Sequence, residues 1–263
     1  MRPNDKRDMS NTRADDIVRD AKKVLLPRIH DGSRRAFLSR TLTLGGVALL
    51  SGCNVSDNAG VEQALTRISR FNDRVQGWIF DPRQLAPTYP ESMITRPFPF
   101  NAYYGPDEIR HVDGESFRLE VSGMARDKRQ WQLHELAAMP QTEQITRHIC
   151  VEGWSAIGRW GGVKFSDFLE RVGADTTAKY IGFKCADDYY TSIDMPTALH
   201  PQTLLTLTYD GQVLPPEYGY PMKLRMPTKL GYKNPKHIQA IFVTNAYPGG
   251  YWEDQGYNWF GGS

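Results

Sequence analysis

Alternating apolar and polar residues predict several β-strands in the second half of the chain. In residues 117–121 the odd positions are Phe, Leu and Val and the even positions are charged, which is the period of a half-buried strand. Further strands are predicted at residues 143–150, 180–185 and 204–209. The last of these runs into Asp210-Gly211, a strong hairpin-turn sequence, before residues 212–214. Helical spacing of apolar residues predicts two short helices, at 133–139 and 163–172.

Prolines and aromatic residues distinguish the segment before these strands. The helical spacing of Val61, Leu65 and Ile68 predicts a short helix, which a tether precedes. Residues 70–100 are expected to form an extended wrap across a surface, because proline excludes long regular structure. The prolines concerned are Pro82, Pro87, Pro90, Pro97 and Pro99. We therefore expect a tether and extended wrap at residues 53–94, followed by one domain at 95–263.

The first 52 residues have the features of an export leader. Ser33-Arg34-Arg35 precedes an uncharged stretch from Thr41 to Ser56, which at 16 residues is shorter than the ~20 that span a bilayer comfortably. Arg34 and Arg35 before such a stretch resemble a twin-arginine signal, which serves bacterial proteins exported already folded. Leu50-Ser51-Gly52-Cys53 resembles a lipobox, with a chance match as the alternative. We expect residues 1–52 to direct export to the periplasm or the outer face of the cytoplasmic membrane, with Cys53 acylated.

Charge is distributed unevenly between this leader and the rest of the chain. The formal net charge is +2, but residues 1–52 hold eleven Lys and Arg against six Asp and Glu. The remainder holds 21 against 24 and is slightly acidic. A slightly acidic domain has no electrostatic footprint for nucleic acid, and no nucleic-acid-binding motif occurs. We therefore expect no nucleic-acid partner.

Cys150 is the main candidate for chemistry. It lies in the stretch Arg147-His148-Ile149-Cys150-Val151-Glu152-Gly153-Trp154-Ser155, at the end of a predicted strand. A thiol binds metal or attacks as the thiolate, and an adjacent cation such as Arg147 is expected to lower its pKa. A side chain at a strand end is held by the sheet behind it.

Other interpretations of Cys150 remain open from the residues alone. An unpaired cysteine is most often a small buried packing residue. Cys185 also falls at the end of a predicted strand, so the two could form a structural disulfide in an oxidising compartment. A copper site on Cys150 and His148 is disfavoured, because a second histidine and a methionine are missing at recognisable spacing.

A basic stretch follows in the C-terminal third. Five cations and no carboxylate occur between Lys223 and Lys236. In an otherwise acidic domain this suits a bound anion, and Gly231 would let the backbone approach it closely. The alternative is a solvated basic loop.

Together these motifs resemble the molybdopterin-binding domain of the sulfite oxidase superfamily, and within it the exported catalytic subunit of bacterial molybdenum-containing methionine sulfoxide reductases. The resemblance covers roughly residues 95–245. It rests on Cys150-Val151-Glu152-Gly153-Trp154-Ser155, Asp194-Met195, Leu199-His200-Pro201, Leu214-Pro215-Pro216 and Gly231-Tyr232-Lys233. It implies an α+β fold with mixed sheets and short helices, and we expect neither a C-terminal dimerisation domain nor a haem domain.

The resemblance also implies a set of site residues. Cys150 takes the position of the catalytic cysteine that ligates molybdenum beside the two dithiolene sulfurs of one pterin. The other implied cofactor contacts are Asn101, Tyr103, Tyr104, Cys185, Tyr218, Lys223, Asn234, Pro235 and Lys236. Three of these depart from the family: Cys185 stands for a small hydroxyl residue, Tyr218 for His or Asn, and Lys223 for Arg. Lysine keeps the charge of arginine but loses its bidentate grip on phosphate.

The activity that the resemblance implies is two-electron oxygen-atom transfer, such as sulfoxide reduction, with molybdenum-molybdopterin as cofactor. Because no haem-binding Cys-x-x-Cys-His and no flavin motif occur, electrons are expected to pass to or from another protein, such as a membrane haem subunit. We expect the catalytic domain to be a monomer. Two alternatives are a member that binds the pterin without turnover and a non-catalytic secreted lipoprotein with a Cys150–Cys185 disulfide.

Overall fold

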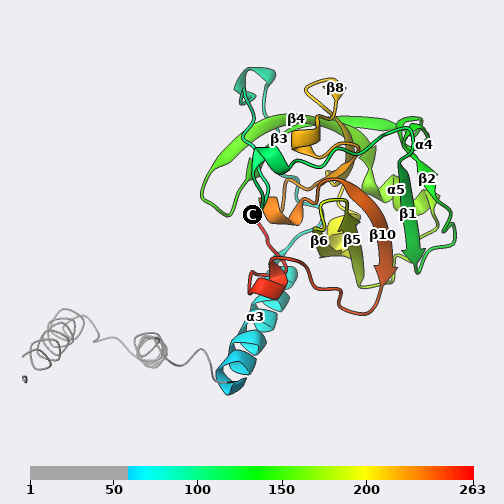
Figure 1. The fold of residues 1–263 in the computed structure, drawn as a ribbon. Helices are drawn as coiled ribbons and strands as arrows, with labels where there is room; N and C mark the ends of the chain where they lie inside the picture. Colours follow the sequence, from blue (N-terminus) through cyan, green and yellow to red (C-terminus); the bar gives the residue numbers. More distant parts are fainter. Residues whose placement is uncertain (1–58) are drawn as a thin grey trace, which may run out of the picture. The chain divides into compact units, whose positions relative to one another are not determined.

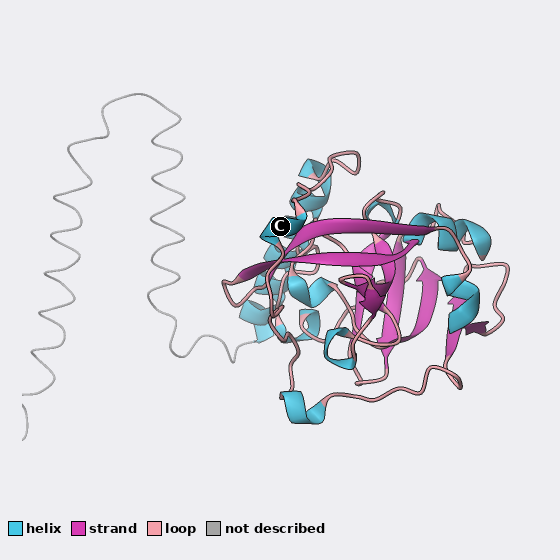
Figure 2. Ribbon diagram, turned by 90° about the horizontal axis from the view of Figure 1, so that it is seen from above, coloured by secondary structure: helices cyan, strands magenta, loops and turns pink. Residues whose placement is uncertain are grey.

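The computed structural model describes residues 59–263, within which Arg67–Ser263 form one compact unit. Two five-stranded sheets form its framework, with short helices around them (Figures 1 and 2). The described strands are β1 (Arg118–Gly123), β2 (Trp131–Gln132), β3 (Gln141–Ile149), β4 (Ser155–Lys164), β5 (Tyr180–Cys185), β6 (Tyr190–Asp194), β7 (Leu204–Tyr209), β8 (Gln212–Val213), β9 (Lys223–Arg225) and β10 (Ile238–Thr244). The helices include α3 (Ala59–Ile79), α4 (Leu133–Ala137), α5 (Phe165–Arg171) and α6 (Met195–Ala198). This confirms the α+β prediction.

One sheet is mixed and the other is antiparallel. The first has the order β2-β1-β10-β5-β6, with β1 and β10 parallel and its other neighbours antiparallel. The second has the order β3-β4-β7-β8, and β9 pairs with the inner strand β7. Leu119 and Val121 of β1 are buried beside Phe168 of α5, so alternation in the sequence does mark the core face.

One predicted boundary and several missed strands need correction. The helix predicted at 163–172 begins only at Phe165, because Val163 and Lys164 complete β4. Strands β2, β4, β6, β9 and β10 were not predicted. In β4 both faces are largely buried and Gly158, Gly161 and Gly162 interrupt the pattern, so no alternation is visible.

The segment before residue 95 also differs from the prediction. Helix α3 continues through Ile79, where an extended wrap was expected, because residues 70–79 contain no proline and the first proline of this segment is Pro82. Beyond Pro82 the chain is irregular, with a bridge from Thr88 to Thr146, as predicted. Residues 67–94 belong to the same compact unit as the following strands.

The leader predictions on Arg34, Arg35 and Cys53 lie outside the described residues. Within residues 59–263, no helix combines the length and the apolar character required to cross a bilayer.

Candidate functional site

The β3–β4 hairpin places Cys150 at the first residue after β3. Ile149 pairs with Ser155, and the hairpin is closed by the Cys150 amide donating to the Trp154 carbonyl at 2.9 Å. Gly153 completes the turn with φ +91°, a conformation that favours glycine. The Cys150 side chain is buried, and the residue follows the end of β3, close to the predicted strand end.

Two polar groups contact the Cys150 sulfur. Asn101 Nδ2 donates to Sγ at 3.3 Å, and Sγ lies 3.6 Å from Glu152 Oε2. The same carboxylate accepts a hydrogen bond from Trp154 Nε1 at 3.0 Å. Burial, with the Glu152 charge as a smaller cause, raises the pKa of the Cys150 thiol.

The prediction that Arg147 lowers the thiol pKa is wrong. Successive side chains of a strand point to opposite faces. In β3 Arg147 is exposed and His148 is buried, so Cys150, two residues after His148, lies on the face opposite to Arg147. The guanidinium of Arg147 lies over the Tyr89 ring, 5.1 Å from its centre. A thiolate at Cys150 therefore needs a bound cation to stabilise it.

A pocket opens beside this thiol. Six of the predicted cofactor contacts line it: Asn101, Tyr103, Cys150, Asn234, Pro235 and Lys236. The sequence did not single out four others, Asp187, Tyr189, Trp252 and Tyr257, as site residues. They come from loops that carry no motif, and only the fold brings them to Cys150.

Two further predicted contacts lie close behind the pocket. The Tyr104 hydroxyl donates to Asp187 Oδ2 at 3.1 Å, while Tyr103 donates to the Asp187 carbonyl. Burial followed by the Asp187 charge raises the pKa of Tyr103 to about 12, so it stays a neutral donor. Cys185 ends β5, where its side chain is buried in the core near Tyr104 and Tyr189.

Tyr218 and Lys223 lie farther from the pocket lining. The Tyr218 hydroxyl donates to the Phe98 carbonyl at 2.9 Å, and its ring packs in an aromatic cluster with Phe98, Trp160 and Tyr209. The Lys223 ammonium lies over the Trp160 ring at 4.7 Å. Tyr218 therefore has a packing role in this structure.

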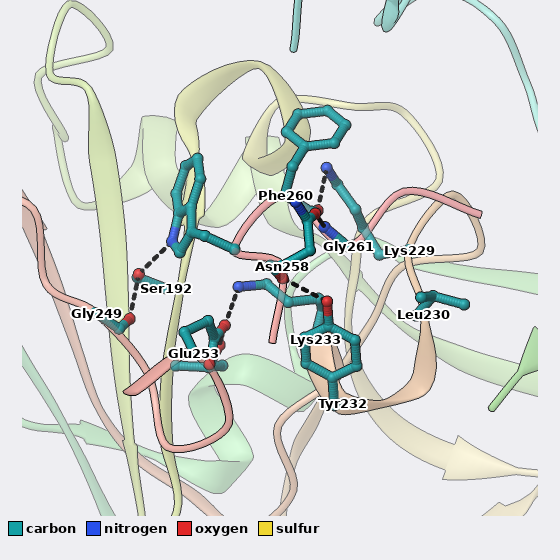
Figure 3. Close-up of polar contacts among 12 residues, drawn as sticks. Ser192, Lys229, Leu230, Tyr232, Lys233, Gly249, Glu253, Asn258, Phe260 and Gly261 are labelled. Carbon is teal, nitrogen blue, oxygen red and sulfur yellow. Dashed lines mark hydrogen bonds and ion pairs between the residues drawn. The ribbon is translucent and has the colours of Figure 1, made fainter. Parts of the chain in front are cut away.

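The structure divides the five cations between Lys223 and Lys236 into two groups. All five are buried, which contradicts the solvated-loop alternative. Lys223, Arg225 and Lys236 surround His148, and their charges together with burial lower its pKa. Lys229 and Lys233 lie in a second group with the C-terminal segment (Figure 3).

Among the described residues the first group forms no ion pair with a carboxylate, although the charges of Asp187 and Glu217 partly oppose the lowering of the Lys236 pKa. Arg225 donates to Asn234 Oδ1 and Thr146 Oγ1, both at 3.3 Å, and to the Arg147 carbonyl. Lys236 Nζ donates to the Glu217 carbonyl at 3.0 Å. Burial lowers the pKa of Arg225 to about 9 and that of Lys236 to about 8, so both remain charged at neutral pH.

This group also leaves polar atoms unsatisfied. Within residues 59–263, Arg225 Nε and both ring nitrogens of His148 are buried without a hydrogen-bond partner. A Cβ on Gly231 would lie 2.7 Å from His148 Nε2, so glycine is needed there for the imidazole as well as for the pocket. Buried charge and unmet donors of this kind are costly unless an anion completes them.

The second group fastens the C-terminal segment to the short helix η5 (Gly231–Lys233). Lys233 forms an ion pair with Glu253, both side chains being 1% exposed. Lys229 Nζ donates to the Phe260 carbonyl at 2.9 Å, and the Tyr232 hydroxyl donates to the Asn258 carbonyl (Figure 3). These cations are satisfied by the protein itself. The predicted anion site is therefore restricted to Lys223, Arg225 and Lys236.

Cys150 and Cys185 are both free thiols, which contradicts the disulfide alternative. Cys150 follows a strand of one sheet and Cys185 ends a strand of the other, so each is held by its own framework. The described residues contain no group of three or more His, Cys, Asp or Glu side chains suited to a metal ion. A metal at Cys150 would therefore take most of its donors from a cofactor.

Comparisons with known proteins agree with these features. The family described as "Oxidoreductase molybdopterin binding domain" matches residues 106–252. The putative protein-methionine-sulfoxide reductase subunit YedZ1 of Azospira oryzae is 71% identical over 95% of both chains. The protein-methionine-sulfoxide reductase catalytic subunit MsrP of Ralstonia nicotianae is 31% identical over 55% of this chain, which spans about half of that relative (49%).

A solved structure gives a weaker likeness. The sulfane dehydrogenase SoxCD from Paracoccus pantotrophus is 18% identical, with a TM-score of 0.49, over 52% of this chain and 40% of that one. The family assignment rests on the sequence matches, which include the β3–β4 hairpin and the basic stretch. The chain belongs to the oxidoreductase molybdopterin-binding domain family of the sulfite oxidase superfamily and is a molybdopterin-dependent oxidoreductase.

Proposed function

We propose that this protein is an exported enzyme that reduces sulfoxides at a molybdenum ion held by the Cys150 thiolate. The observation that carries the proposal is the position of a buried, free thiol in a pocket walled by Asn234, Pro235 and Lys236, beside three buried cations that lack a carboxylate. A soft sulfur ligand and an anion site are the two attachments that a molybdenum pterin phosphate requires.

The donor set fits this cofactor. Arg225 and Lys236 would neutralise the pterin phosphate, and the unsatisfied Arg225 Nε offers it a further hydrogen bond. Asn234 holds Arg225 through its side-chain oxygen, which also accepts from the Met226 amide at 2.6 Å. Burial and the two neighbouring cations lower the pKa of Lys223, and a bound phosphate would favour its protonated form, while Arg225 supplies a planar guanidinium close by.

The residues around the thiol have definable roles in such a site. When bound, the cofactor supplies a metal that cycles between two redox levels and accepts an oxygen atom. Asn101 donates to Sγ and so favours the thiolate over the thiol. Glu152, near the same sulfur, is an acceptor that is placed to hold a proton or a water molecule at the mouth of the pocket.

The reaction proposed is the conversion of a sulfoxide, two electrons and two protons into a thioether and water. The relatives' names specify methionine sulfoxide, and we extend that substrate class to this chain. Tyr103, Trp252 and Tyr257 line the pocket with aromatic surface, against which sulfur groups pack favourably. The electrons would come from a separate protein, such as a membrane haem subunit, in keeping with the word "subunit" in those names.

Two cysteine substitutions test the metal-ligand assignment. Cys150→Ser should abolish sulfoxide reduction with a dye as electron donor, because a hydroxyl is a harder and less acidic donor than a thiol. The pterin should remain partly bound through Lys223, Arg225 and Lys236. Cys185→Ser is the matched control: it makes the same atomic change at a buried site outside the pocket lining, and activity should stay within about fivefold of the parent.

The measurements are molybdenum and pterin content, dye-linked turnover and melting temperature of both variants side by side. Full activity of Cys150→Ser, or equal loss of activity and stability in both variants, would contradict the ligand assignment. Protein from a cofactor-competent host that contains no pterin would contradict the proposal as a whole.

A further inference from the structure

Helix α3 carries an apolar face that the rest of the described chain does not cover. Ile68, Phe71, Trp78 and Ile79 are 56%, 60%, 85% and 68% exposed. At 3.6 residues per turn these positions fall within about 100° of one another around the helix. We call these four residues the α3 apolar face. A contiguous exposed face with two aromatic residues is unusual for a surface without a partner.

The opposite side of α3 is fastened to the domain. Asp73 accepts hydrogen bonds from Asn258 Nδ2 at 2.7 Å and from the Phe260 amide at 3.1 Å. Gly77 lies against the Phe260 ring, which a Cβ at Gly77 would meet at 3.7 Å. These contacts fix the rotation of the helix, so the α3 apolar face is directed outward by the fold.

Arginines line one edge of this face. Arg67, Arg70 and Arg74 follow the spacing i, i+3, i+7 and lie between the apolar face and the side fastened to the domain. All three are exposed. The only acidic residue in 67–79 is Asp73, and it points to the domain. The edge therefore carries three positive charges that no carboxylate on the same helix segment balances.

We propose that the α3 apolar face docks onto an anionic lipid surface. Exposed Phe and Trp beside a row of arginines is the composition of helices that lie in the interface plane of a membrane. The aromatic rings would enter the boundary of the acyl region, while the guanidinium groups meet lipid phosphates. A second copy fits less well, since a symmetric pair would bring like arginine rows together.

The short connection between Cys53 and α3 also favours a lipid surface as the partner of the α3 apolar face. Five residues separate Cys53 from Ala59, the first residue of α3. At a maximum of ~3.6 Å per residue, this connection spans no more than ~22 Å over its six steps. A lipid on Cys53 would thus keep α3 next to the bilayer, and one acyl chain with one interfacial helix makes the two signals that stable anchoring needs.

Vesicle co-sedimentation tests the proposal without the acyl chain. The full chain carrying Cys53→Ala is mixed with vesicles of phosphatidylglycerol and phosphatidylethanolamine, or of phosphatidylcholine alone. We expect binding to the anionic vesicles that weakens as salt is raised. Adding Phe71→Ser and Trp78→Ser should lower the partition coefficient by about tenfold or more, because two aromatic side chains no longer leave water. Adding Arg70→Gln and Arg74→Gln should lower it by roughly fivefold per arginine at low salt.

Controls separate the helix face from other causes. Val213→Ser removes a side chain that is 68% exposed on β8, and Arg110→Gln removes an exposed cation; neither should change partitioning. All variants share the same leader, so any leader contribution is common to them. Circular dichroism and melting temperature confirm folding, and dye-linked turnover should be unchanged because no residue of the face lines the Cys150 pocket.

Three results would overturn the proposal. The first is equal vesicle binding by the parent and the Phe71→Ser/Trp78→Ser variant. The second is binding that appears only when the vesicles contain a membrane protein partner, which would identify the face as a protein interface. The third is a concentration-dependent dimer that the same substitutions disrupt. None of these depends on sulfoxide reduction, so the lipid interaction and the proposed activity fail or hold separately.

Discussion

Breaking the buried ion pair between Lys233 and Glu253 is expected to destabilise the protein strongly. The two side chains pair with each other (Figure 3), and both are 1% exposed. Glu253 also accepts from Thr191 Oγ1 at 2.9 Å. Lys233→Met would leave the Glu253 carboxylate buried without its cation, and losing one partner of a buried pair costs about 3–5 kcal/mol. At about 2–4 °C per kcal/mol for a domain of this size, the melting temperature should fall by about 6–20 °C.

The double variant Lys233→Met/Glu253→Gln distinguishes the charge effect from simple loss of packing. Glutamine keeps the shape of glutamate and can still accept from Thr191, but it carries no charge to leave unpaired. Replacing a buried pair by neutral groups of similar volume is often close to neutral. The double variant should therefore recover most of the stability lost in Lys233→Met. Such a recovery means that the effects of the two substitutions on the free energy of unfolding are strongly non-additive.

Urea unfolding of cofactor-free and cofactor-loaded protein supplies the measurement, because a tightly bound cofactor complicates a single transition. Arg129→Met is the control: Arg129 pairs with Glu135 at 2.9 Å, but the side chains are 42% and 28% exposed, and little change is expected. A loss below about 1 kcal/mol in Lys233→Met, or a double variant less stable than both single variants, would refute the reasoning.

Two other predictions concern a second buried lysine and the leader. Burial lowers the pKa of Lys229 to about 7, with Asp194 and Asp73 opposing the shift. Lysine in the unfolded chain titrates near pH 10.4, so Lys229 loses its proton at lower pH in the native state, and the free energy of unfolding should rise with pH between about 7 and 10. Lys229→Met should flatten the accompanying rise in melting temperature. An unchanged slope of melting temperature against pH would contradict this prediction. The double substitution Arg34→Lys/Arg35→Lys should retain the protein in the cytoplasm. Cys53→Ala should release the protein from the membrane fraction when fractionation is done at high salt, because salt screens the attraction between the α3 arginines and the lipids. Unchanged fractionation of either variant would contradict the corresponding leader assignment.

The end of the strand that positions Cys150 falls within one residue of the prediction. Burial alternates along β3, but its buried side chains, Gln144, Thr146 and His148, are polar, so this strand lacks the apolar alternation that marks a core strand such as β1. The adjacent strand β4 could not be predicted in the same way. It is central in its sheet, buried on both faces and interrupted by glycines at 158, 161 and 162. At Gly162 a Cβ would lie 2.0 Å from the Leu205 carbonyl, so close strand packing removed the signal that sequence analysis uses.

The site was predictable where its residues belong to motifs and unpredictable where they come from separate loops. Cys150, Asn101 and the turn at 234–236 line one pocket, as the family resemblance implied. Asp187 follows β5, while Trp252 and Tyr257 lie in the C-terminal segment, far from any motif. The thiol pKa was predicted in the wrong direction because sequence adjacency of Arg147 and Cys150 says nothing about which face of the strand each occupies.

The basic stretch shows why charge counts alone cannot locate a ligand. Five cations within fourteen residues appear equivalent in the sequence, yet Glu253 approaches only one of the two groups. Where a carboxylate reaches the cation the fold satisfies its own charge, and where none reaches it the charge remains available for a ligand. Lys233 and Asn234 are adjacent in the sequence, but Lys233 pairs with Glu253 whereas Asn234 lines the Cys150 pocket. Substitution at Lys233 should therefore lower the stability of the cofactor-free protein first. Lys223→Gln should lower pterin content while leaving that stability equal or higher, because burial and the charges of Lys236 and Arg225 already lower the pKa of Lys223 and make its protonated form costly without a bound anion.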